Sequence, residues 1–165
     1  MTSGRFWFPT CTLLLVGALL AASQGCGGGG GEPCSECPPI EGRYALELQE
    51  GPLPAACDGL TVVLPEGPLD MARQGSAVAA MLDGMTLRGT LYSTYNFNLV
   101  GSSLGAADGG IGGPESASLT GRYIPVLRDG GVPRLEGNWQ GNFSGTSGGG
   151  TRRCAVTRSF TATPQ

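Results

Sequence analysis

Residues 135–143 read Leu-Glu-Gly-Asn-Trp-Gln-Gly-Asn-Phe. Successive side chains of an extended chain point to opposite faces, so Leu135, Trp139 and Phe143 share one face and polar side chains occupy the other. Alternation with a period of two residues is typical of a half-buried β-strand. This segment therefore predicts a strand whose apolar face lies on a core.

The same alternation recurs in seven other segments, and no window of residues 40–165 sustains helical periodicity with caps. These segments lie at residues 44–48, 60–64, 78–82, 85–91, 95–99, 117–123 and 154–160. Asp83-Gly84 is a favoured two-residue hairpin turn and joins two of them. We therefore expect eight strands, although the Ala-rich residues 77–82 also fit a short helix.

One short pattern recurs in four places: an apolar residue, any residue, Gly, any residue and a large apolar residue. Its glycines are Gly42, Gly89, Gly121 and Gly137. Glycine weakens a strand interior, so its repeated use on an apolar face needs a physical reason. We infer that these glycines let the strands curve, with an aromatic residue of a neighbouring strand covering each gap. Repeated curvature closes a sheet into a barrel and removes its exposed edges.

Eight antiparallel strands with short connections predict an all-β domain that forms a small up-and-down barrel, with a β-sandwich as the alternative. The architecture resembles that of lipocalin-like barrels, which carry Gly-x-Trp on the first strand. Here Gly42-Arg43-Tyr44 lies on the first strand, and Gly137-Asn138-Trp139 lies on the seventh. The resemblance implies that the interior binds one small apolar ligand, whereas the number of large residues favours an interior filled by its own side chains. The candidate lining residues are Tyr44, Phe97, Tyr123, Trp139 and Phe143.

The N-terminal residues predict export. Residues 12–22 form a short apolar run that follows Arg5 and precedes small residues, which is the three-part pattern of a secretory signal peptide. Ser23-Gln24-Gly25-Cys26, followed by glycines at 27–31, resembles the lipobox of bacterial lipoproteins. The resemblance implies cleavage after Gly25, acyl chains on Cys26 that anchor the protein in a lipid bilayer, and, with Gly27 after the cysteine, an outer-membrane location. The alternative is ordinary cleavage that releases a soluble secreted protein.

These inferences divide the chain into three parts. Residues 1–25 are the signal peptide, residues 26–39 are the lipidated cysteine with a Gly- and Pro-rich tether, and residues 40–165 are a single β-domain. Two or three acyl chains hold a protein firmly on a membrane without a spanning helix.

The cysteine count fits an exported protein. The six cysteines are Cys11, Cys26, Cys34, Cys37, Cys57 and Cys154. Removal of the signal and acylation of Cys26 leave four, which pair as disulfides in an oxidising compartment. Spacing alone allows three connectivities. We favour Cys57 with Cys154 and Cys34 with Cys37, because Cys57 and Cys154 both adjoin strand-like segments. The alternatives for Cys34-Ser-Glu-Cys37 are a redox motif or half of a zinc site.

The composition excludes several functions. The net charge is −3, and the ten basic residues are all Arg, so we expect no nucleic-acid partner. There is no His, which removes the commonest general base and metal ligand. Only carboxylates such as Glu115 and Glu136 are left for acid–base chemistry, and Ser144 has no base beside it in the sequence. We therefore expect no enzyme, no cofactor and no metal, but a cell-envelope lipoprotein whose β-domain is a structural or adaptor surface with protein partners that the sequence leaves unnamed.

Overall fold

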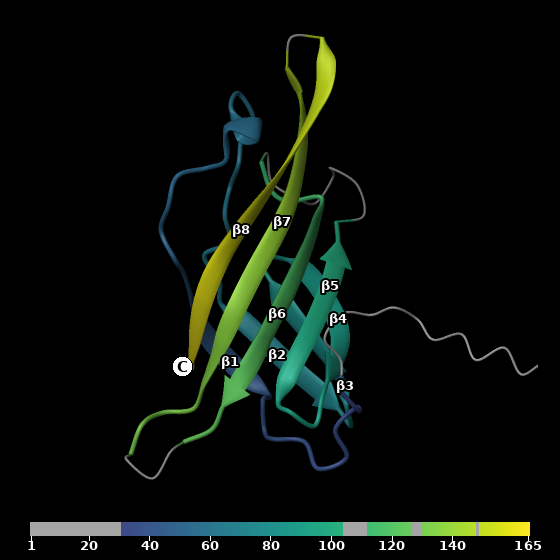
Figure 1. The fold of residues 1–165 in the computed structure, drawn as a ribbon, viewed down its shortest axis with the longest axis vertical. Helices are drawn as coiled ribbons and strands as arrows, with labels where there is room; N and C mark the ends of the chain where they lie inside the picture. The colour runs from purple at the N-terminus through teal and green to yellow at the C-terminus, as the bar shows by residue number, and fades with distance from the viewer. Residues whose placement is uncertain (1–30, 104–111, 127–129, 148) are drawn as a thin grey trace, which may run out of the picture.

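The chain folds into a closed barrel of eight antiparallel strands in sequence order (Figure 1). The computed structural model describes residues 31–103, 112–126, 130–147 and 149–165. The elements are β1 (Gly42–Leu48), the short 3-10 helix η1 (Ala55–Cys57), β2 (Leu69–Gln74), β3 (Ala77–Leu82), β4 (Met85–Leu91), β5 (Asn96–Ser102), β6 (Ser116–Ile124), β7 (Arg134–Ser147) and β8 (Gly150–Pro164). The predicted up-and-down barrel is confirmed, and the β-sandwich alternative is wrong.

The position of the second strand differs from the prediction. Residues 60–64 form no strand. Leu60, Val62 and Leu64 are partly buried and pack against the core from a connection, which is why they alternate with exposed residues. The strand lies instead at β2, where only Leu69 and Met71 are buried. Two apolar residues give too short an alternation to stand out from the sequence around them.

Residues 77–82 form strand β3 rather than a helix, and the predicted hairpin turn follows it. Asp83 and Gly84 have φ values of 46° and 80°, and Leu82 pairs with Met85 across the turn. Positive φ at both central residues is the geometry of the tight turn that matches the twist of two antiparallel strands.

The barrel interior is filled by apolar side chains from all eight strands. Trp139, Phe97 and Phe143 are the largest fully buried ones, and the rings of Trp139 and Phe143 meet edge to face with centroids 6.3 Å apart. Aromatic pairs of this kind contribute about 0.5–1.5 kcal/mol beyond the burial of their area. The core therefore occupies the axis of the barrel.

Two of the repeated glycines lie side by side in the sheet. Gly121 of β6 pairs with Gly137 of β7, and this pair is flanked by Phe97 of β5 and Phe160 of β8. A Cβ atom at Gly121 would lie 2.7 Å from Phe97 Cζ and 3.2 Å from Phe160 Cζ, so the two rings cover the glycine. The aromatic cover that the repeat predicts is confirmed here.

The barrel has two distinct ends. The N-terminal end is bounded by the start of β1 and the end of β8, where Gln165 donates a backbone hydrogen bond to Arg43 O at 3.0 Å. We call the opposite end the hairpin end, after the hairpin that β7 and β8 form there. Strands β7 and β8 are longer than the others and project beyond the rest of the barrel there (Figure 1).

Candidate functional site

The five candidate lining residues all lie inside the barrel. Tyr44, Phe97, Tyr123, Trp139 and Phe143 are buried and belong to one core cluster. Tyr44, Tyr123 and Phe97 lie toward the N-terminal end of the barrel on β1, β6 and β5, Trp139 lies near the middle of β7, and Phe143 lies closer to the hairpin end of β7. The structure therefore brings together the residues that the sequence groups, and they pack with other side chains of the core.

Residues 31–41, which we call the N-terminal cover, lie across the N-terminal end of the barrel. Cys34 N donates to Leu91 O at 3.1 Å, and Ser93 N donates to Glu32 O at 2.9 Å. Ile40 is fully buried, and its carbonyl accepts a hydrogen bond of 3.0 Å from the Tyr44 hydroxyl. Residues 31–39, which the sequence assigns to the tether, thus lie against the barrel and are bonded to it.

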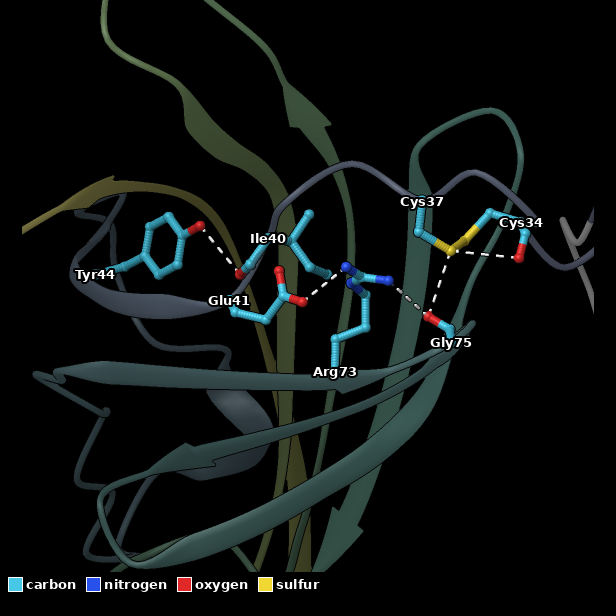
Figure 2. A network of polar contacts seen from close by, with 7 residues as sticks. All are labelled: Cys34, Cys37, Ile40, Glu41, Tyr44, Arg73 and Gly75. Carbon is cyan, nitrogen blue, oxygen red and sulfur yellow. Dashed lines mark hydrogen bonds and ion pairs between the residues drawn. A yellow bond between two sulfur atoms is a disulfide. The ribbon is translucent and has the colours of Figure 1, made fainter.

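Arg73 binds the N-terminal cover from the inward-facing side of β2. It is the last residue of β2 in phase with the buried Leu69 and Met71. Its guanidinium pairs with Glu41 at 2.7 Å and donates to Gly75 O at 3.1 Å, as Figure 2 shows. Its Nε is buried with no hydrogen-bond partner among the described residues.

The disulfide Cys34–Cys37 lies in the same cover. Its Cα atoms are 5.3 Å apart, and Cys37 Sγ lies 3.3 Å from Gly75 O, as Figure 2 also shows. An oxidised sulfur has no hydrogen to donate, so we treat this approach as a contact rather than a hydrogen bond. The sulfur and Arg73 therefore meet at one carbonyl.

The hairpin end is covered by residues 49–64, which we call the hairpin cover. The disulfide Cys57–Cys154 ties it to β8, with Cα atoms 5.2 Å apart. Arg158 Nη2 donates to Gly51 O at 2.8 Å and to Pro52 O at 2.9 Å. Leu60 packs over Gly145 of β7.

The two covers are built alike. Arg158 lies on β8 in phase with the buried Val156 and Phe160, as Arg73 lies in phase with Leu69 and Met71 on β2. Arg73 binds the Glu41 carboxylate and Gly75 O at the N-terminal end, and Arg158 binds Gly51 O and Pro52 O at the hairpin end. Each cover also contains a cysteine that forms a disulfide. The Nε of Arg158, like that of Arg73, is buried without a hydrogen-bond partner in the described part of the chain. Both disulfide pairings predicted from the sequence are confirmed.

Burial changes the acidity of two tyrosines at the N-terminal end. It raises the pKa of Tyr44, and nearby Tyr123 and Glu41 raise that pKa further. Burial also raises the pKa of Tyr123, with a smaller contribution from Tyr95, whose ring meets that of Tyr123 edge to face at 6.4 Å. Both buried phenols therefore stay protonated in the folded protein at neutral pH.

One polar contact differs from what the sequence suggested. Ser144 has no base beside it in the sequence, but its hydroxyl donates to a carboxylate oxygen of Glu115, which precedes β6. Glu136 pairs with Arg134 on its own strand. The chain has no His that would complete a Ser-His-carboxylate triad with Ser144.

The outer face of β5–β8 carries three rows of uncharged side chains, which we call the polar wall. In register across the four strands the rows are Asn98, Thr120, Asn138 and Ser159; Val100, Ser118, Gln140 and Thr157; and Ser102, Ser116, Asn142 and Ala155. All but Val100 and Ala155 end in a hydroxyl or an amide, and none is ionisable.

Several side chains of the polar wall bond across the strands. Thr120 Oγ1 lies 3.4 Å from Asn98 Oδ1, Ser159 Oγ lies 3.3 Å from Asn138 Oδ1, and Asn142 Nδ2 lies 3.0 Å from Ser116 Oγ.

Sequence reasoning missed Arg73, Arg158 and the polar wall as features. The polar halves of the strand alternation were the available signal for the wall, but its rows depend on the register between strands. Nothing in the sequence marks an arginine as the residue that holds a cover, because the covers are distant in the chain.

The predicted lipidation site and the possibility of a metal site or a membrane-spanning helix remain to be considered. Cys26, the predicted lipidation site, lies outside them. Within the described residues, no three His, Cys, Asp or Glu side chains gather as metal ligands would, and no helix is both long and apolar enough to span a bilayer.

Comparisons of the chain with protein-family models, with curated proteins and with solved structures found no match.

Proposed function

We propose that the protein is a cell-envelope lipoprotein, anchored in the outer membrane by acyl chains on Cys26, whose non-catalytic barrel is a structural or adaptor surface. The anchor is supported by the apolar run at residues 12–22, the small residue Gly25 directly before Cys26 and the glycines after it. The two disulfides support an oxidising compartment.

The single observation that carries the adaptor role is the filled and covered barrel. Its axis is occupied by large buried side chains such as Trp139, and the two covers lie across its ends. A domain built in this way offers its outer surface to partners.

The polar wall is the part of that surface best suited to an adaptor. Hydroxyl and amide groups offer both hydrogen-bond donors and acceptors. A partner that binds them does not have to desolvate a charge, which is the costly step at many polar interfaces. We infer that the wall, through residues such as Gln140 and Asn138, makes the contacts of the barrel with other envelope components.

The intact mass of the mature protein extracted from membranes tests the anchor. We expect a chain that begins at Cys26, carries acyl chains and contains two disulfides. The Cys26→Ser variant is the matched control and should lose the acyl mass and leave the membrane fraction. A water-soluble product that begins at another residue would overturn the proposal.

Site-specific photo-crosslinking in cells tests the adaptor surface. We expect a crosslinker at Gln140, in the polar wall, to form a discrete adduct of defined mass. A crosslinker at Met81, which is exposed on β3 away from the wall, is the matched control and should form none. Equal labelling from both positions, or none from Gln140, would count against the wall.

A further inference from the structure

The four tyrosines of the chain all gather at one end of the barrel. Tyr44 lies at the start of β1 and Tyr123 near the end of β6. Tyr92 and Tyr95 lie in the connection from β4 to β5, where Tyr92 forms a bridge with Pro33 of the N-terminal cover. Strand direction places all of these positions at the N-terminal end. Tyr44 and Tyr123 are buried in the core, whereas Tyr92 is partly exposed and Tyr95 is exposed. An exposed tyrosine suits the interface between membrane and water, because its ring is apolar and its tip is polar.

The same end exposes aliphatic side chains. Val126 and Val132, in the connection from β6 to β7, are 55% and 63% exposed, and Tyr95 is 36% exposed. The hairpin end also exposes Leu53 and Val63, but it has no tyrosine. Apolar groups at a rim stabilise contact with a bilayer by leaving water for the boundary between headgroups and acyl chains.

The chain reaches the barrel at this end. Gly31 lies beside Ser93 and Thr94, and the hydrogen bond from Ser93 N to Glu32 O fixes the next residue. Gly31 follows Cys26 by five residues. A fully extended chain would therefore place the two residues at most about 18 Å apart.

We propose that the N-terminal end of the barrel rests against a phospholipid bilayer, with Tyr95, Val126 and Val132 in the headgroup region. This inference rests on the proposed anchor at Cys26 and deepens it, because it gives the barrel one orientation. In this orientation the projecting β7–β8 hairpin points away from the membrane. The polar wall then lies on the side of the barrel, facing along the membrane surface rather than toward it.

Depth-dependent fluorescence quenching tests the orientation in the full lipidated protein. Tryptophan is placed at Val132 (Val132→Trp) and, as a matched control at the other end, at Val63 (Val63→Trp), which is 52% exposed. The variants are reconstituted in phosphatidylcholine vesicles with and without brominated acyl chains. The wild-type protein, whose Trp139 is fully buried, gives the background.

We expect brominated lipid to reduce the added emission of Val132→Trp by about half, because interfacial groups lie ~5–10 Å into the boundary between headgroups and acyl chains. The emission of Val63→Trp should not change. Three results would overturn the orientation: equal quenching of both variants, stronger quenching of Val63→Trp, or no quenching of either. If Cys26 is acylated in the same preparation, the proposed anchor still holds. A mature protein without acyl chains would instead overturn the proposed function and this inference with it.

Discussion

Arg158 donates a hydrogen bond from its Nη2 to the carbonyl oxygen of Gly51, 107 residues earlier in the chain, at 2.8 Å. The bond joins the last strand to the first connection. Together with the bond to Pro52 O, it satisfies two carbonyl groups of the hairpin cover.

Replacing Arg158 with Met keeps an unbranched apolar stem, shorter than that of Arg, and removes the hydrogen-bond donors. Gly51 O and Pro52 O lose their partner at an exposed surface, where water can replace the donor, so we expect the free energy of unfolding to fall by about 0.5–1.5 kcal/mol. Urea denaturation measures this. Arg153→Met, on the exposed face of the same strand, should change it by less than about 0.5 kcal/mol. Equal effects of the two variants would show that the bonds of Arg158 contribute nothing specific.

The two disulfides should stabilise the fold to different extents. Cys57 and Cys154 are 97 residues apart, whereas Cys34 and Cys37 are three apart. On the chain-entropy model, loops of these lengths correspond to about 4.7 and 2 kcal/mol. We expect the double variant Cys57→Ala/Cys154→Ala to unfold at clearly lower urea concentration than Cys34→Ala/Cys37→Ala. The reverse order would contradict the model for this protein.

Gly137→Ala should destabilise the barrel strongly. A Cβ atom there would lie 2.2 Å from Thr120 O and 2.5 Å from Gly121 Cα, and both are backbone atoms that cannot turn aside. We expect a loss of about 1–3 kcal/mol, as for other overpacked sites. Gly150→Ala in β8, where an added Cβ meets nothing within 4 Å, is the control and should be neutral. A thermal melt compares the two, and equal midpoints would argue against close approach of β6 and β7.

Stability should fall at alkaline pH because of Tyr44. Burial raises the pKa of this phenol above its ordinary value of 10.0, so the unfolded chain loses the proton first as pH rises. The unfolded state then binds fewer protons than the folded state, and the free energy of unfolding decreases above about pH 10. Urea denaturation across pH 8–11 measures the slope. The Tyr44→Phe variant should lose the hydrogen bond to Ile40 O and show a shallower slope, and an unchanged slope would assign the effect to other groups.

Binding of an apolar ligand inside the barrel is the alternative function, and the fluorescence of Trp139 tests it. The ring is fully buried in the middle of the interior. Because side chains fill that space, we expect fatty acids and retinoid-like probes to cause no saturable change in its fluorescence. A saturable shift would show that the core opens for a ligand and would favour the lipocalin-like alternative.

The sequence predicted most of the barrel because the signal is local. Strand alternation has a period of two residues and places the inward side chains of β7 and β8 directly. Strand β2 was missed because Leu69 and Met71 are its only buried residues, and residues 60–64 imitate a strand because one side of that connection lies on the core.

The rest depends on contacts between distant segments. In the sequence, Arg73 and Arg158 cannot be told from ordinary surface arginines. Their roles become visible only when the fold brings the two covers into contact with them. The polar wall emerges only when the register of β5–β8 aligns residues such as Asn98 and Thr120. Both disulfides were predicted because Cys57 and Cys154 adjoin strand-like segments, and pairing these two leaves Cys34 with Cys37.

The bond between Cys57 and Cys154 has a mechanical consequence. Force applied between the N-terminal cover and the tip of the β7–β8 hairpin has a short covalent route: through β1 to Cys57, across the sulfurs to Cys154, and along β8 to the tip. Strands β2 to β6 lie off this route. A load pulling the tip of the hairpin away from the N-terminal cover would therefore be carried along the covalent chain by β1, the first connection and the start of β8.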